Sequence, residues 1–138
     1  MRIRIGSIPQ RVATGAFIAH AGIEKWSSPR DRAEGIHGMA AAAFPALRPI
    51  PAPIFIKLLA AGELATGALL LSPVTSNAVA GTALTGFAGS LLTLYARTPA
   101  MHKPGSIWPT PAGTAVSKDV WMLGIGLGLL ADGLTRRR

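Results

Sequence analysis

Four long stretches of this sequence are apolar and nearly free of charge, and they restrict the fold more than any other feature. The clearest stretch runs from Asn77 to Ala96 and contains no charged residue. Three others cover about 8–26, 54–72 and 115–134. An α-helix needs about 20 apolar residues to cross the ~30 Å hydrocarbon core of a bilayer. We therefore predict an all-α protein, a transmembrane four-helix bundle that occupies residues 1–138 as a single membrane domain.

Charge is scarce and unevenly distributed along the chain. Lys, Arg, Asp and Glu make up 14% of the residues, whereas they make up about a quarter of a typical soluble domain. The net charge of +8 would ordinarily suggest nucleic-acid binding, because clustered Lys and Arg neutralise phosphates. Here the basic residues flank apolar segments, as anchors in anionic lipid headgroups do, and no nucleic-acid motif accompanies them. We therefore expect the lipid bilayer, and not nucleic acid, as the partner.

Residues that carry redox and metal chemistry are sparse. The chain has no cysteine, which excludes thiol relays, thiolate zinc sites and iron–sulfur clusters in this chain alone. His20, His37 and His102 lie on different segments without the spacing of metal ligands, so we predict no metal site. No nucleophile motif is present, and the sequence identifies no catalytic residue.

The first apolar stretch is the weakest of the four, because its centre, residues 12–23, contains His20 and two glycines. A secretory signal peptide is the alternative interpretation, since Arg2, Arg4 and Arg11 precede a short apolar region and Ala19-His20-Ala21 resembles a cleavage site. Glycine and histidine are unusual in a signal peptide, but they suit a helix that three others shield from lipid. We therefore predict a crossing here too.

Aromatic residues provide an independent check on the number of crossings. Trp and Tyr prefer the membrane interface, where an apolar ring meets hydrated headgroups. Three of these residues lie at the ends of predicted crossings and one lies in the loop between the third and fourth crossings. If the four crossings alternate in direction, all four residues lie on the same side of the bilayer: Trp26, Tyr95, Trp108 and Trp121. This common placement supports four crossings.

A short helix is predicted between the first and second crossings, at about 29–44. Ser28 is suited to the N-cap, Pro29 to the first helical position, and the acid Asp31 follows three residues after the cap. Apolar residues then recur at helical spacing as far as Phe44. We expect this helix to lie on the membrane surface.

Small residues are spaced four apart in several apolar stretches, and such residues let helices approach closely in membranes. The pairs are Gly15 with Ala19, Thr85 with Gly89, Gly86 with Ser90, and Gly124 with Gly128. We assign them to packing within the bundle; the alternative is that one pair marks a contact between two copies in a homo-oligomer. The short turn at 73–76 predicts that the second and third crossings are antiparallel neighbours.

Glu63 lies deep in the second predicted crossing, midway between Pro53 and Pro73. A charged group at that depth is costly unless it is paired, hydrated or neutralised. As an isolated carboxyl, Glu63 is expected to be protonated, since desolvation disfavours its charged form. It would then transfer protons or bind a quinone or lipid headgroup; alternatively, it is a buried carboxyl bonded to a neighbouring helix.

Other ionisable residues are predicted to gather at the end of the bundle opposite the termini. They come from all four crossings: His20, Glu24, Lys25, Lys57, Arg97, Lys118 and Asp119. One interpretation is that they form salt bridges that fix the helix register. The other is a polar ligand-binding cavity with Glu63 at its floor. At the other end, Asp132 is expected to pair with the basic run Arg136 to Arg138.

Two segments resemble a known family. Residues 11–26, R-V-A-T-G-A-F-I-A-H-A-G-I-E-K-W, begin with Arg11 and close with G-x-x-K at Gly22 and Lys25. Residues 57–63, K-L-L-A-A-G-E, place a glycine and an acid after an apolar start. These segments resemble the first two helices of DoxX-family membrane proteins, and the glycine-rich later stretches also fit.

The resemblance implies a four-helix bundle in the cell inner (plasma) membrane with both termini cytoplasmic. Counting Lys and Arg leaves the orientation open, because the two sides carry similar numbers. Some relatives are described as subunits of membrane oxidoreductases, including ones for thiosulfate to quinone transfer. The resemblance carries over no catalytic residue, and without cysteine any redox role depends on a partner or a bound quinone.

Two functional hypotheses follow from these patterns. The first is a non-catalytic membrane subunit or anchor that supports a redox or envelope-associated protein partner. The alternative is a membrane protein that binds quinone or a small lipid through Glu63 and the polar cluster. Proton-coupled transport is a third class, which the lack of a detectable inverted repeat disfavours.

Overall fold

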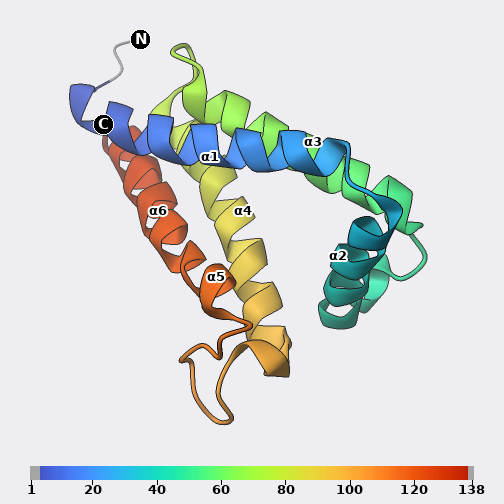
Figure 1. The fold of residues 1–138 in the computed structure, drawn as a ribbon. Coiled ribbons are helices and arrows are strands. Elements are labelled where there is room, and N and C mark those ends of the chain that lie inside the picture. The colour runs from blue at the N-terminus through green and yellow to red at the C-terminus, as the bar shows by residue number, and fades with distance from the viewer. Residues whose placement is uncertain (1–3, 137–138) are drawn as a thin grey trace.

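The computed structural model describes residues 4–136, and all regular secondary structure in that range is helical except for one isolated bridge between His102 and Pro109. The α-helices are α1 (Ile8–Trp26), α2 (Arg30–Ala43), α3 (Ala52–Leu71), α4 (Asn77–Arg97), α5 (Thr114–Ser117) and α6 (Asp119–Thr135). Short 3-10 turns cover Ile5–Ser7, Pro45–Leu47 and Pro99–Met101. The predicted all-α class is therefore confirmed (Figure 1). Arg2, Arg137 and Arg138 lie outside the described residues.

Three stretches of helix are long and apolar enough to cross a membrane: Ala52–Leu71, Asn77–Arg97 and Thr114–Thr135. The last comprises α5 and α6, which a break at Lys118 separates. α1 is not among them, because Arg11, Glu24 and Lys25 fall within its 19 residues. The three apolar stretches indicate a membrane protein, whereas a crossing by α1 needs support from outside the helix.

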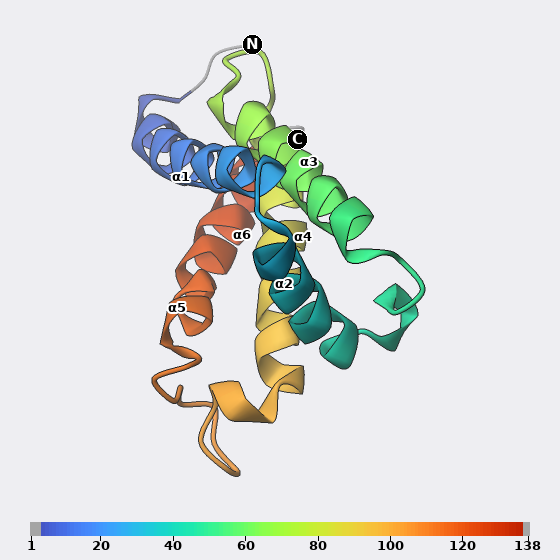
Figure 2. The same cartoon turned by 45° about the vertical axis from the view of Figure 1, so that its right-hand side comes forward.

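The four long helices form two antiparallel pairs, α1 with α3 and α4 with α6 (Figures 1 and 2). The pairs meet at a small apolar core built by all four helices, from Ile18, Leu70, Ala80, Leu84 and Leu129. From there they diverge, and α3 contacts α4 much less than it contacts α1. The single four-helix bundle predicted from the sequence is therefore not confirmed. The second and third crossings are joined by a turn, but neither is the main partner of the other.

Glycines explain why α1 pairs with α3. A Cβ atom added to Gly15 would lie 2.9 Å from the Leu70 side chain, and one added to Gly67 would lie 2.8 Å from the Cβ of Ala19. Gly22 is equally close to Leu64. Contacts this short leave no room for a methyl group, so the two backbones approach as closely as helices can. The predicted packing role of Gly15 and Ala19 is confirmed.

The glycines that bring α4 and α6 together are not the ones that the four-residue spacing predicted. Gly81 lies against the backbone of Gly126 and Leu130, and Gly133 lies against Ala78. A Cβ atom added to Gly124 or Gly128, the G-x-x-x-G pair, would have no atom of another helix within 4 Å. The packing role predicted for that pair within the chain is therefore wrong, because both glycines lie on the exposed side of α6. Their role between two copies stays a prediction.

Replacing a buried and an exposed glycine by alanine is expected to give effects of opposite sign. Gly81→Ala places a methyl group against the backbone of α6, and overpacking of this kind costs about 1–3 kcal/mol. Gly128→Ala meets open space, and alanine stabilises a helix relative to glycine by about 0.5–1 kcal/mol. Unfolding of the purified variants in detergent, followed by circular dichroism, measures both. Equal effects of the two substitutions would contradict the assignment of the α4–α6 interface.

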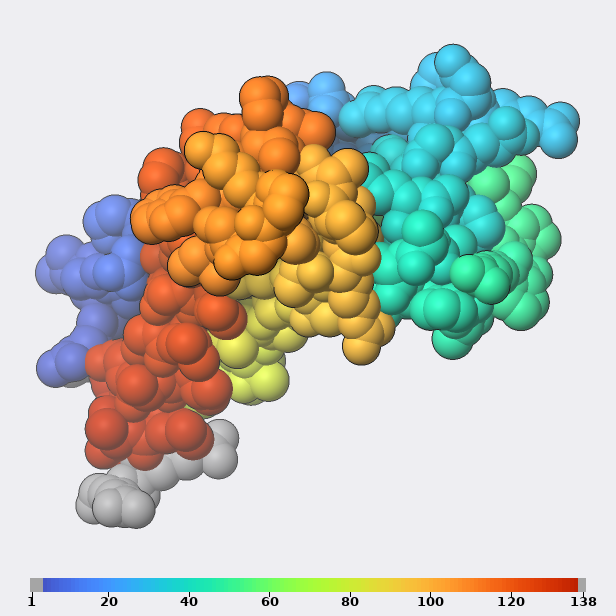
Figure 3. All heavy atoms as spheres, turned by 90° about the horizontal axis from the view of Figure 1, so that it is seen from below, coloured from blue at the N-terminus to red at the C-terminus, as the bar shows by residue number. Residues whose placement is uncertain are grey.

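α2 starts one residue later than predicted, and its cap differs. Pro29 occupies the N-cap position, and the Ser28 hydroxyl donates to the carbonyl oxygen of Glu24 at 3.3 Å. The predicted N-cap role of Ser28 is wrong, because its hydroxyl bonds the end of α1. α2 packs against α3, and it also contacts α4 near the loop that follows α4 (Figure 3). The helix is confirmed, and its position on the membrane surface stays a prediction.

Candidate functional site

Arg11 forms the most extensive side-chain hydrogen-bond set among the described residues. Its side chain leaves α1 and enters the end of α3, where the residue is 3% exposed. All five guanidinium N–H groups donate, at 2.8–3.0 Å, to four backbone carbonyls and one amide oxygen, those of Leu69, Leu70, Ser72, Thr75 and Asn77. The last carbonyls of a helix lack partners within the helix. Arg11 therefore caps α3 and joins it to both α1 and α4.

This role of Arg11 was not predicted. An arginine that precedes an apolar run usually anchors in the lipid headgroups. The partners are mostly backbone carbonyls, which leave no signature in the sequence. The one available signal was the polar turn between α3 and α4, which an antiparallel α1 brings to the same level as Arg11.

A polar chain continues from Arg11 to both ends of the described residues. The Asn77 amide donates to Asp132 Oδ2 at 2.8 Å, and Arg4 Nη1 donates to Asp132 Oδ1 at 2.7 Å. Arg136 Nε lies 3.7 Å from Asp132 Oδ2. The predicted pairing of Asp132 with the basic run is thus confirmed for Arg136, and Arg4 is a partner that was not predicted.

Glu63 is paired with Lys25. The Lys25 ammonium lies 3.0 Å from Oε1 and 3.1 Å from Oε2 of Glu63, whose side chain is 5% exposed. Helical side chains lean toward the N-terminus of their helix, so Lys25 reaches back along α1 to the depth of Glu63. The expectation of an isolated carboxyl is therefore wrong. Of the two interpretations, the geometry matches the carboxyl bonded to a neighbouring helix.

The structure places the remaining predicted site residues in several separate positions. On α1, His20 Nε2 lies 3.6 Å from Glu24 Oε1 across one exposed helical turn. Lys57 of α3 donates to the carbonyl oxygen of Trp26, and its ammonium lies 4.3 Å from the centre of the Trp26 ring. These groups and the Lys25–Glu63 pair share one end of the α1–α3 pair.

Arg97 lies away from the Lys25–Glu63 pair, at the contact between α4 and the end of α2. It donates to the carbonyl oxygen of Ala43 at 3.2 Å and stacks on Phe44, 5.1 Å from the ring centre. Lys118 and Asp119 lie at the break between α5 and α6. Over residues 4–136, no hydrogen bond or ion pair joins Arg97, Lys118 or Asp119 to Glu63. The single predicted cluster is divided because the helix pairs diverge.

A pocket of about 480 Å³ opens where α1 ends and α2 and α3 begin. Its lining includes Trp26, Ser28, Arg30, Pro53, Ile56 and Lys57. Glu63 is not part of this lining. The pocket is therefore not the predicted cavity that has Glu63 at its floor. Within residues 4–136, no three His, Asp or Glu side chains are grouped so as to hold a metal ion.

Comparison with known proteins finds no relative: no family model matches the chain, and neither a curated protein nor a solved structure does. The DoxX resemblance therefore stays an expectation from the two sequence segments. Fold and site together define a helical protein with three candidate membrane spans, in which buried ionisable groups connect the helices.

Proposed function

We propose that the chain is a multi-pass protein of the plasma membrane that crosses the bilayer four times, with both termini in the cytoplasm. Three apolar helices support the membrane location. For α1, the support is that α3 provides partners for its two inward-facing cations: Arg11 bonds carbonyls at one end and Lys25 bonds Glu63 at the other. Paired or hydrogen-bonded ionisable groups are tolerated within membranes. α1 then crosses together with α3, although it is too polar to do so alone.

Within that membrane, we propose a non-catalytic subunit or anchor for a redox or envelope-associated protein. The observation that carries this proposal is the engagement of the buried ionisable groups: Arg11 and Glu63 hold this chain's own helices together. The outward surface carries large apolar side chains, such as Phe17 and Trp121, which are 78% and 68% exposed. Apolar surface of this kind fits lipid or the helices of a partner. The resemblance to DoxX proteins supplies the expectation that the partner is a redox protein.

Purification of the tagged chain from its native membrane in mild detergent tests this role. We expect another membrane or membrane-associated protein to co-purify at a fixed ratio, both with the unaltered chain and with Glu63→Gln. Gln keeps the shape of Glu and a hydrogen bond to Lys25. A chain that purifies alone with one bound quinone per copy, lost in Glu63→Gln, would contradict the proposal and support quinone binding.

The second candidate function is binding of a small lipid. The pocket beside Lys57 favours it, because it joins cationic and apolar side chains at one end of the α1–α3 pair. Glu63 contributes less to this candidate than the sequence suggested, since Lys25 already occupies its carboxylate.

A further inference from the structure

The pocket at the end of α1 combines two kinds of wall. Pro53, Ile56 and the Trp26 ring provide apolar surface, and Lys57 and Arg30 provide cations from two different helices. Trp26 ends α1 and Lys57 lies in the second turn of α3. Trp and Lys at helix ends are typical of the level where hydrocarbon meets headgroups. A ligand that matches both walls has an anionic head and an apolar tail.

Both cations retain donors for a ligand. An ammonium has three N–H donors, and Lys57 uses one on the carbonyl oxygen of Trp26. Arg30 uses Nε on Glu34 at 3.0 Å, which leaves its terminal guanidinium nitrogens without a hydrogen bond among the described residues. The Arg30 and Glu34 side chains are 84% and 55% exposed. Exposed pairs of this kind contribute little and exchange readily, so Glu34 does not block an anionic ligand.

We infer that this pocket binds the phosphate of an anionic phospholipid, with Lys57 and Arg30 on the phosphate oxygens and the acyl chains along Pro53 and Ile56. Charge-assisted hydrogen bonds to phosphate are among the strongest that side chains form. The bilayer supplies such phosphates at the level of Trp26. The site rests on the proposed membrane location, but it does not depend on the subunit role or on Glu63.

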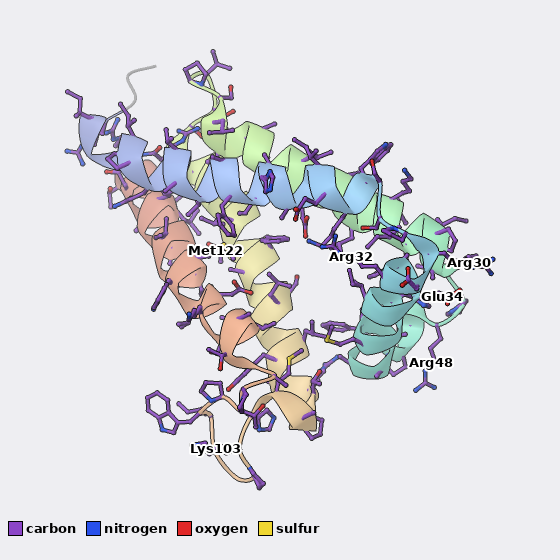
Figure 4. All side chains as sticks on the ribbon, viewed as in Figure 1. Arg30, Arg32, Glu34, Arg48, Lys103 and Met122 are labelled. Atoms are coloured by element: carbon purple, nitrogen blue, oxygen red, sulfur yellow. The ribbon has the colours of Figure 1, made fainter. Side chains whose placement is uncertain are left out.

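Native mass spectrometry of the full chain in detergent, with phosphatidylglycerol or phosphatidylcholine added, tests the inference. We expect a preference for phosphatidylglycerol that falls at least about tenfold in the double variant Lys57→Gln/Arg30→Gln, since each lost charged hydrogen bond weakens binding by about that factor. The matched control is Arg48→Gln/Lys103→Gln, which removes two exposed charges away from the pocket (Figure 4). The control keeps the preference. Lys57→Arg keeps the charge and is expected to bind as the unaltered chain does.

Three outcomes would overturn the inference: equal binding of the two lipids, equal loss in the control and pocket variants, or full competition by inorganic phosphate. The last result would make the ligand a free phosphate. Fractionation of the same cells separates this failure from failure of the membrane location. A membrane-bound chain without lipid preference rejects only the pocket, whereas a chain absent from the membrane rejects both.

Discussion

Arg11→Ala is expected to separate α1 from the end of α3 and to lower the free energy of unfolding by at least about 3 kcal/mol. The substitution leaves four backbone carbonyls and the Asn77 amide oxygen without their donor. Buried acceptors without partners cost about 1–3 kcal/mol each, and water that enters the site recovers part of that cost. Arg11→Lys is expected to be intermediate, since an ammonium cannot reproduce the planar set of donors.

Unfolding of the purified variants in detergent measures this effect, with Arg4→Ala as the matched control. Arg4 carries the same charge as Arg11 and lies at the same end of the molecule. Its side chain, however, is 65% exposed and makes one hydrogen bond, to Asp132. We expect the control to stay close to the unaltered chain. A loss of stability in Arg11→Ala no larger than in Arg4→Ala would show that the cap on α3 contributes nothing.

Glu63→Leu is expected to destabilise the chain by about 3 kcal/mol, because it leaves the Lys25 ammonium without its carboxylate. Lys25→Met is expected to cost a similar amount by leaving Glu63 unpaired. The double variant Lys25→Met/Glu63→Leu is expected to recover most of the loss, since apolar residues of similar volume often replace a buried ion pair without cost. The two single effects are thus strongly non-additive.

A double-mutant cycle in detergent measures the coupling between these residues. Glu24→Ala is the control: its pair with His20 has side chains 53% and 71% exposed, so the change is expected to stay within about 0.5 kcal/mol. Additive effects of Lys25→Met and Glu63→Leu would contradict a structural pair. Such a result would restore Glu63 as a carboxyl available to protons or a ligand.

The extents of the helices could be predicted because local signals fix them. The expected crossings 8–26, 54–72 and 77–96 match α1, α3 and α4 to within two residues at each end. Proline and serine mark those ends, and the apolar runs between them have the length of a bilayer. The break at Lys118 was not predicted, since residues 115–134 read as one continuous apolar stretch.

The partners of the helices could not be predicted, because they depend on which face each small residue occupies. Spacing alone selected Gly124 and Gly128, whereas Gly126 and Gly133 are the ones that contact α4. The same limit applies to charges. Arg97 bonds a carbonyl oxygen of α2, which no pattern of opposite charges in the sequence would reveal. Lys25 and Glu63 were both singled out, but their pairing required the antiparallel register of α1 and α3.

We propose that α1 crosses the membrane beside α3 despite its ionisable residues, and this proposal can be tested directly. The chain has no cysteine, so single cysteines introduced at exposed positions label without background. Sided labelling of intact cells with a membrane-impermeant thiol reagent compares Gly6→Cys, Val74→Cys, Arg48→Cys and Lys103→Cys. We predict that Arg48→Cys and Lys103→Cys react from outside, while Gly6→Cys and Val74→Cys react only after permeabilisation. If Gly6→Cys reacts together with Arg48→Cys while Val74→Cys stays protected, α1 does not cross the membrane and the proposed topology is wrong.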